Sequence, residues 1–262
     1  MRSHYRASDI TQALVAADVR RGDTIFSHIS LLKLGLIGDA RTPQEMVATF
    51  TSAITNILGP EGCFITPSYS YSFCKGEPFN LSTTPSDVGP FSNQLLQEPK
   101  VQRSREPIFS VAALGNVEDL FADLPHSCFG ADCIYDRLLK RRGKIVNFGL
   151  SLSYLTPIHH LEYTIGVPYR FDKPFRGLIK TENGHYVEEE WLYYVRNLDQ
   201  PSQPDCSELE REGQRGGLVQ KAKLGLGYVT SVSVDRYFSM ADKMISLDPW
   251  YLTVNGNWRS KQ

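Results

Sequence analysis

The chain of 262 residues is long enough for one large domain, and its charges nearly cancel, with 28 Lys and Arg against 29 Asp and Glu. This balance excludes nonspecific binding of nucleic acid or of an acidic membrane surface as the main role of the protein. The five cysteines lack zinc-finger spacing, the N-terminus lacks an apolar signal segment, and no run of about 18 apolar residues occurs. We therefore expect a soluble, cytoplasmic protein with reduced thiols.

Helical and strand-like patterns alternate in the first 150 residues. A first helix is expected to begin with Ser8 as its N-cap, and a buried strand is expected at 24–26. A second helix is predicted after Thr42, because Thr42, Pro43 and Glu45 form a capping box with proline at the first helical position. Short apolar runs predict further buried strands at 63–66, 110–114 and 144–149. This alternation indicates an α/β fold with a central, largely parallel sheet flanked by helices.

The pattern changes near residue 170. Strand-like runs flank Glu182-Asn183-Gly184, which predicts an antiparallel hairpin, and helical spacing predicts a last amphipathic helix at 234–245. We expect one domain, 1–262, with an α/β core of about residues 1–170. A smaller C-terminal lobe of about residues 171–262, built on the antiparallel hairpin, is expected on the acceptor side.

Two segments outside these elements have unusual composition. Residues 67–109 are rich in Ser, Thr, Pro and aromatic side chains, and loops of this length are uncommon unless they serve function. Acidic side chains gather at 188–190 and again between 199 and 212. These acidic stretches form either an acceptor wall for a cationic substrate or a solvated charged face.

The densest group of chemically active residues lies between Thr156 and Tyr163. On a helix that begins near Pro157, His159 and Glu162 are three residues apart and share one face, so the carboxylate can orient the imidazole. Histidine accepts a proton near neutral pH, which suits a general base. Thr156 is expected at the N-cap, beside backbone N–H groups that can stabilise an oxyanion. The alternative is that one of His159 and His160 is a structural histidine and Glu162 a surface charge.

Other reaction classes lack their sequence motifs. The chain contains no HExxH, no GxSxG, no P-loop and no dinucleotide-binding glycine motif, and its other histidines are scattered. No cysteine lies in a recognisable nucleophile turn. A metal or cysteine hydrolase, a serine hydrolase, a kinase and a dehydrogenase are therefore disfavoured, and no metal is expected.

The order of several segments resembles the aminoglycoside 3-N-acetyltransferase family, which has the antibiotic N-acetyltransferase fold and not the GNAT fold. The resemblance extends over most of the chain. Its segments are Gly22-Asp23, His28-Ile29-Ser30-Leu31, Gly59-Pro60-Glu61-Gly62, Thr66-Pro67, Thr84-Pro85-Ser86-Asp87-Val88-Gly89, Arg103-Ser104-Arg105-Glu106-Pro107 and Thr156 with His159 and Glu162.

This resemblance implies an acetyl-CoA-dependent N-acetyltransferase that acts by direct transfer. It assigns His159 as the general base and Glu162 as its carboxylate partner. In the mechanism that we expect to follow, Thr156 or nearby backbone N–H groups hold the oxyanion. The resemblance also implies that acetyl-CoA binds along two segments, made of His28, Ile29, Ser30 and Leu31 and of Arg103 and Ser104.

The acceptor implied by the resemblance is an amino sugar, either aminoglycoside-like or nucleotide-linked. Asp87, Glu106 and Asp199 are the candidate acceptor contacts, although Glu106 stands where the family usually has histidine. A nucleotide-linked acceptor needs cations, and the basic run from Arg137 to Arg142 either offers them or is an exposed helix end with favourable dipole placement, which we favour. We expect a small-molecule partner and neither nucleic acid nor membrane, and a homodimer stays open. The alternative function is a non-catalytic binding or assembly protein that retains the fold.

Overall fold

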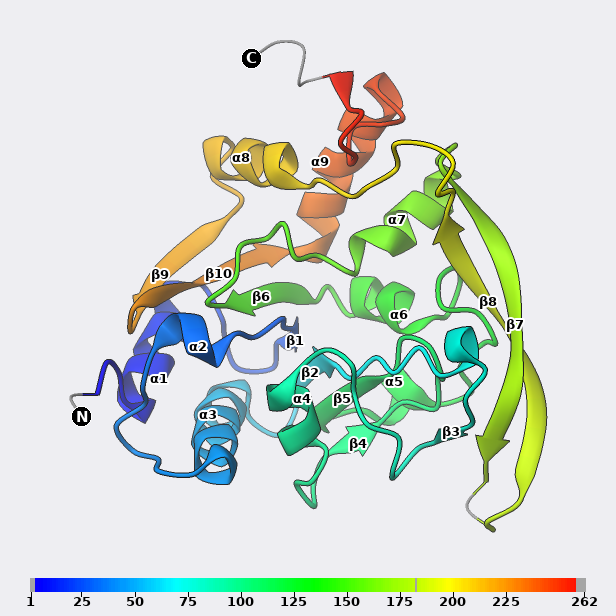
Figure 1. Cartoon of the computed structure of the whole chain (residues 1–262). Coiled ribbons are helices and arrows are strands. Elements are labelled where there is room, and N and C mark those ends of the chain that lie inside the picture. The colour runs from blue at the N-terminus through cyan, green and yellow to red at the C-terminus, as the bar shows by residue number, and fades with distance from the viewer. Residues whose placement is uncertain (1–2, 182, 258–262) are drawn as a thin grey trace.

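A seven-stranded sheet forms the centre of the computed structural model, which describes residues 3–181 and 183–257 (Figure 1). The strand order is β4-β5-β2-β1-β6-β10-β9. The strands are β1 (Thr24–Phe26), β2 (Cys63–Pro67), β4 (Gln102–Arg103), β5 (Val111–Gly115), β6 (Lys144–Phe148), β9 (Gln220–Leu224) and β10 (Gly227–Ser233). The predicted α/β class is confirmed. Parallel pairing is confined to β2, β1 and β6, however, and the outer strands pair antiparallel.

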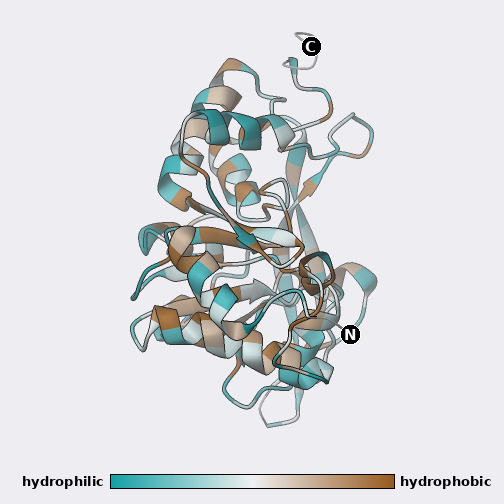
Figure 2. Ribbon diagram, turned by 90° about the vertical axis from the view of Figure 1, so that its left-hand side faces the viewer, coloured by the Kyte–Doolittle hydropathy of each residue, from teal (hydrophilic) through white to brown (hydrophobic). Residues whose placement is uncertain are grey.

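Amphipathic helices cover both faces of this sheet (Figures 1 and 2). Successive strand residues point to opposite faces, so Ile25 packs against α1 and α3 whereas Phe26 belongs to the core shared with α6, α7 and α9. The helices are α1 (Ala7–Ala16), α2 (Leu31–Leu34), α3 (Pro43–Leu58), α4 (Pro90–Leu95), α5 (Glu118–Phe121), α6 (Ile134–Lys140), α7 (Ile158–Ile165), α8 (Ser207–Arg215) and α9 (Val234–Leu247), with a 3₁₀ turn η1 (Phe73–Lys75). Within the described ranges, no helix combines the length and hydrophobicity that crossing a bilayer requires.

The helix starts show where local sequence was sufficient. The capping box at α3 is confirmed, because Glu45 N donates to Thr42 Oγ1 at 3.1 Å while Thr42 N donates to the Glu45 carboxylate at 3.2 Å. The predicted helix is present as α1, but its predicted N-cap was wrong, since Arg6 is the N-cap and Ser8 lies exposed in the first turn. Asp9 accepts a hydrogen bond from Arg6 N at 2.8 Å, so a carboxylate satisfies this helix start.

A long antiparallel hairpin runs along one side of the molecule (Figure 1). It consists of β7 (Arg170–Lys180) and β8 (Tyr186–Arg196), and β3 (Phe79–Asn80) pairs in parallel with β7 to complete a three-stranded sheet. The predicted hairpin is thus confirmed and longer than expected; Glu182 of its turn lies outside the described residues. After the hairpin, β9 and β10 return to the central sheet, so this part of the expected lobe 171–262 packs as core.

The topology brings three loops together at one edge of the sheet. The parallel strands β2, β1 and β6 are neighbours, and their carboxyl ends continue into the segments that begin at Ser68, Ser27 and Gly149. Ligand sites of α/β proteins form at this edge, because the loops that leave parallel strands converge there.

Candidate active site

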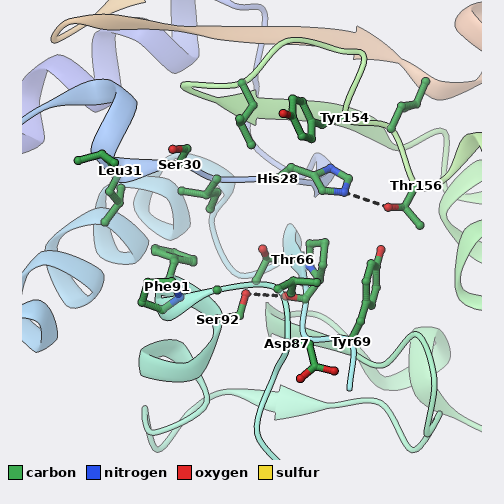
Figure 3. Close-up of a pocket in the computed structure, with 18 of the residues that line it drawn as sticks. His28, Ser30, Leu31, Thr66, Tyr69, Asp87, Phe91, Ser92, Tyr154 and Thr156 are labelled. Atoms are coloured by element: carbon green, nitrogen blue, oxygen red, sulfur yellow. Dashed lines mark hydrogen bonds between the residues drawn. The ribbon is translucent and has the colours of Figure 1, made fainter. Parts of the chain in front are cut away.

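A cleft of about 940 Å³ opens at this edge of the sheet (Figure 3). One wall is the loop of residues 28–31, the opposite wall combines residues 66–71 with 87–94, and residues 150–159 close the inner end. The lining is mostly apolar or hydroxylic, and it includes His28, Ile29, Ser30, Leu31, Val47, Thr66, Tyr69, Tyr71, Asp87, Phe91, Tyr154, Leu155, Thr156, Ile158, His159 and Cys206. The cleft therefore suits a long ligand with an apolar middle section.

Asn147 at the end of β6 fixes two of these walls. Its buried side chain accepts a hydrogen bond from His28 N at 3.1 Å and donates to the carbonyl oxygens of Ser151 at 2.8 Å and Tyr154 at 2.9 Å. Gly149 follows with φ +67°, and a Cβ there would lie 2.6 Å from a carbonyl oxygen of the 28–31 loop. Only glycine allows the two walls to approach this closely.

His159 lies at the inner end of the cleft within a buried ionic group. Its Nδ1 is 2.5 Å from Glu162 Oε2, one turn further along α7, which confirms that the two side chains share a face. Arg170 Nε lies 2.8 Å from the same carboxylate as an ion pair without an aligned hydrogen bond, and Tyr169 donates to Glu162 Oε1 at 2.7 Å. The carboxylate is 2% exposed whereas the imidazole is 19% exposed. Glu162 is thus a buried partner and not a surface charge.

The contacts of His159 determine its protonation. The ionised Glu162 carboxylate can only accept, which favours the proton of neutral His159 on Nδ1 and leaves Nε2 as an acceptor, whereas Arg170 Nη2 can only donate and favours the opposite tautomer. Arg170 Nη2 is 2.9 Å from Nδ1, and burial together with this guanidinium holds the pKa of His159 below its usual 6.5, against the opposing effect of Glu162. Burial raises the pKa of Glu162, but His159 and Arg170 outweigh that effect and its net pKa is lowered. Near neutral pH, the pair is a neutral imidazole beside a carboxylate.

Thr156 has a different role from the expected one. The prediction that it caps α7 was wrong, because the helix begins at Ile158 and Pro157 takes the N-cap position without a side-chain cap. The Thr156 hydroxyl instead lies 3.1 Å from His28 Nε2 (Figure 3). The backbone N–H groups of Ile158, His159 and His160 donate to the carbonyl oxygens three residues earlier, at 3.0 to 3.1 Å. The first turn of α7 therefore offers no free donor from these groups.

His160 is the structural histidine of the pair. It is 5% exposed and faces α6, where its Nδ1 lies 3.4 Å from Gly130 N and 3.7 Å from Cys133 Sγ. Its Nε2 lies 3.8 Å from Asp136 Oδ1. Only one of the two adjacent histidines thus reaches the cleft.

Arg103, Ser104 and Glu106 lie outside the cleft lining. Arg103 is buried, donates to the carbonyl oxygens of Ser68 at 2.8 Å and of Thr84, and stacks over the ring of Phe79. Ser104 Oγ accepts from Val111 N at 2.9 Å. These groups hold the loops behind one wall, whereas the sequence predicted direct contacts with acetyl-CoA.

Glu106 points into the protein and not toward the cleft. Its Oε1 accepts from Ile108 N at 2.9 Å, from Phe109 N at 2.6 Å and from Cys128 Sγ at 3.4 Å. Burial raises its pKa to about 7. Its carboxylate closes a tight turn and has no route to an acceptor in the cleft.

Of the other two predicted acceptor contacts, one lines the cleft and the other does not. Asp87 lines the cleft, pairs with Lys75, and is the one carboxylate among the described lining residues. Asp199 is exposed in the loop after β8, outside the lining. The acidic stretches are tied up locally, for example in the pair of Glu190 with Arg176 at 2.7 Å.

The basic run on α6 is also engaged with nearby groups. Arg137 donates to backbone carbonyls of residues 119–123, Lys140 pairs with Asp132 at 2.6 Å, and Arg141 pairs with Asp119. None of these cations lines the cleft. In the part of the chain that the structure describes, no cluster of three His, Cys, Asp or Glu side chains has metal-binding geometry.

Sequence reasoning missed Tyr69, Tyr169 and Arg170. Tyr69 lies in the long segment 67–109 that was expected to be functional, but the segment contains many aromatic residues and nothing distinguished this one. Arg170 lies at the first position of β7, and its contact with Glu162 depends on how the hairpin packs on α7. A search for the partner of a buried carboxylate would have pointed to a nearby arginine.

A cleft at the carboxyl edge of a mixed α/β sheet that ends on a carboxylate-paired histidine contains a side chain that can act as a general base. The chain belongs to the aminoglycoside 3-N-acetyltransferase family, since the family model of that description matches residues 27–246. The predicted family is therefore confirmed.

Individual relatives agree with this assignment. Aminoglycoside N(3)-acetyltransferase IV from Salmonella sp. is 26% identical over 172 residues, which cover 64% of this chain and 63% of that protein, less than two thirds of its length. The solved structure of the aminoglycoside acetyltransferase AAC(3)-IVa apoenzyme superposes with a TM-score of 0.76 at 22% identity, over 96% of this chain and 92% of that one. AAC-IIIb in a binary complex with CoASH gives a TM-score of 0.77 at 19% identity, over 92% and 96% of the two chains. AAC-VIa bound to sisomicin gives 0.79 at 20% identity, over 93% and 98%.

Proposed function

We propose that this protein is an acetyl-CoA-dependent N-acetyltransferase that acetylates an amino group of an aminoglycoside-like amino sugar. The observation that carries the proposal is the position of His159, whose Nδ1 is held by Glu162 and whose ring closes the inner end of a long apolar cleft. The family assignment and the aminoglycosides in the names of its relatives support the same chemistry.

The cleft fits the acyl donor. A pantetheine arm is long, thin and mostly apolar, and Ile29, Leu31, Val47 and Phe91 offer apolar side chains along the outer part of the cleft. Acetyl-CoA would bind between these residues with its thioester at the inner end, near Thr156 and His159. A related structure was solved with CoASH, which supports the choice of this co-substrate.

The residues at the inner end support direct transfer. His159 Nε2 accepts a proton from the acceptor ammonium, and the free amine then forms a C–N bond with the acyl carbon. As the C–S bond breaks, the imidazolium gives its proton to the departing sulfur, and the nitrogen of the new amide loses its second proton to solvent, so that the acceptor ammonium and acetyl-CoA yield the N-acetylated product, CoASH and one H⁺. Glu162 stabilises the imidazolium in between and keeps the ring in the reactive tautomer. No acyl-enzyme is needed.

An aminoglycoside-like acceptor agrees better with the side chains than a nucleotide-linked sugar. Asp87, although it pairs with Lys75, is a carboxylate in the cleft that an acceptor ammonium can approach, and no Lys or Arg occurs among the described lining residues to bind a diphosphate. Arg137, Lys140 and Arg141 of the basic run are already paired or donate to backbone carbonyls.

An acceptor panel tests the proposal. Purified protein would be mixed with acetyl-CoA and either aminoglycosides or nucleotide-linked amino sugars, with thiol release recorded and the N-acetylated product identified by mass spectrometry. We expect turnover with at least one aminoglycoside. Turnover only with nucleotide-linked sugars would overturn the acceptor class, and acetyl-CoA that fails to bind would favour a non-catalytic protein that retains the fold.

A further inference from the structure

Two hydroxyl groups meet at the inner end of the cleft, one from Tyr69 and one from Thr156 (Figure 3). Tyr69 follows β2 and Thr156 follows β6, the two strands that flank β1 in the sheet. Two donors from separate loops therefore lie where the thioester carbonyl is expected under the proposed function.

Tyr135 fixes the direction of the hydrogen bond at Tyr69. The two phenol oxygens are 3.0 Å apart, and Tyr135 is 1% exposed between the rings of Phe26 and Phe129. Within the described ranges, Tyr69 is the polar partner found for the Tyr135 hydroxyl. Because a buried hydroxyl proton without an acceptor is costly, Tyr135 donates to Tyr69. The Tyr69 proton is then directed away from Tyr135, toward Thr156 and the cleft.

His28 acts on Thr156 in the same way. Burial lowers the pKa of His28 to about 4, so the ring is neutral and carries one proton. Its Nδ1 is buried without a partner in the described part of the chain, whereas Nε2 lies 3.1 Å from Thr156 Oγ1. The tautomer with its proton on Nε2 donates to Thr156 Oγ1 and leaves only a lone pair unpaired at Nδ1, whereas the Asn147 side chain, which raises the His28 pKa against burial, favours the other tautomer. With the proton on Nε2, the Thr156 hydroxyl, like that of Tyr69, has its own proton available to donate.

The backbone N–H groups beside His159 are not available to bind an oxyanion, so side chains have to supply the donors. The N–H groups of Ile158, His159 and His160 already donate to carbonyl oxygens within the turn that starts α7. An acyl oxygen that gains negative charge beside His159 needs hydrogen-bond donors that are not already donating to another group of the protein. The Tyr69 and Thr156 hydroxyls meet this requirement when they accept hydrogen bonds from Tyr135 and His28.

We propose that the Tyr69 and Thr156 hydroxyls together form the oxyanion hole of this enzyme, with Tyr69 as a second catalytic residue beside Thr156 and with Tyr135 and His28 as positioning residues. The inference rests on the proposed acetyl transfer. It adds a phenolic donor that no local sequence motif marked.

The test compares Tyr69→Phe with a matched control, Tyr237→Phe. Tyr237 is also a fully buried tyrosine, its hydroxyl has no hydrogen-bond partner in the described residues, and it lies on α9 outside the cleft lining. Tyr69→Phe should lower kcat by about 10²-fold, the usual effect of removing one oxyanion donor, while the Kd for acetyl-CoA stays within about 3-fold. Tyr237→Phe should leave both values unchanged.

A spectroscopic measurement separates a catalytic from a structural role and needs no acceptor. The infrared carbonyl band of enzyme-bound acetyl-CoA labelled with ¹³C at the acyl carbon should lie at higher frequency in Tyr69→Phe than in the wild type, because a hydrogen-bond donor has been lost. Tyr135→Phe should shift the band in the same direction and lower kcat less, by about 10-fold, because it leaves the donor in place but less well oriented.

The outcomes distinguish a failure of the proposed function from a failure of the proposed oxyanion hole. Acetyl-CoA that does not bind the wild type would overturn the proposed function and the oxyanion hole with it. Acetyl transfer by the wild type, with kcat and carbonyl frequency unchanged in Tyr69→Phe, would overturn only the role of Tyr69. A loss of kcat without a band shift would also reject Tyr69 as a donor to the acyl oxygen.

Discussion

Replacing Glu162 with Gln changes the charge of the buried group around His159 with almost no change in size. Glu162 contacts His159 Nδ1 at 2.5 Å, Arg170 Nε at 2.8 Å and the Tyr169 hydroxyl at 2.7 Å. The amide can donate to Nδ1, which favours the tautomer with its proton on Nε2, and that tautomer cannot accept a proton from the acceptor. Arg170 meanwhile becomes a buried cation without its counter-charge, which lowers the pKa of His159 further.

Both effects have expected sizes. Loss of the correct histidine tautomer lowers kcat by about 10²- to 10⁴-fold, and removal of one partner of a buried ion pair destabilises the fold by about 3–5 kcal/mol. Steady-state thiol release measures the first, and urea denaturation measures the second. Tyr169→Phe is the control, because it keeps the carboxylate, removes one hydrogen bond and should cost only about 1 kcal/mol with a small change in kcat. Glu162→Gln with wild-type kcat would refute the assigned roles of both Glu162 and His159.

Three further predictions concern protonation and the backbone. Because the pKa of His159 is lowered from 6.5, kcat/KM should fall with decreasing pH only below pH 6.5, and a midpoint above that value in the pH profile would contradict the lowered pKa. Gly115→Ala should destabilise the protein by about 3 kcal/mol or more, since φ is +102° and a Cβ would lie 2.2 Å from the Gly62 carbonyl oxygen. Gly22→Ala, at φ +85° with open space around it, should cost only about 1 kcal/mol in the same denaturation series, and equal losses would refute the steric explanation. Thr42→Ala should cost about 1 kcal/mol through loss of the α3 cap, and unchanged thermal unfolding would show that this cap contributes little.

The features that sequence predicted well are local ones. The cap at Thr42 depends on three neighbouring side chains, and the contact of His159 with Glu162 depends on one turn of helix, so both follow from spacing alone. The positions of β1, β2, β5 and β6 followed from short apolar runs for the same reason, whereas β3, β4, β9 and β10 were not predicted. The pairing of the strands did not follow, because an apolar run does not reveal its neighbours in the sheet, and the outer strands proved antiparallel.

The features that sequence could not predict depend on how distant segments pack. Glu106 was expected at the acceptor, but the backbone N–H groups of a tight turn take its carboxylate. Arg170 completes the buried ionic group only because β7 begins beside α7. Tyr69 faces Thr156 because β2 and β6 both end at the same edge of the sheet. The spacing of these residues along the chain does not reveal that they lie close together in the fold.

The most direct test of the central claim is the rate of acetyl transfer by His159→Ala, measured as thiol release with the acceptor that the wild type uses. Calorimetric titration with acetyl-CoA would accompany it. If His159 is the general base at the end of the cleft, kcat should fall by about 10²- to 10⁴-fold while the Kd for acetyl-CoA changes by less than about 3-fold. Turnover close to that of the wild type, with acetyl-CoA bound as before, would contradict the account.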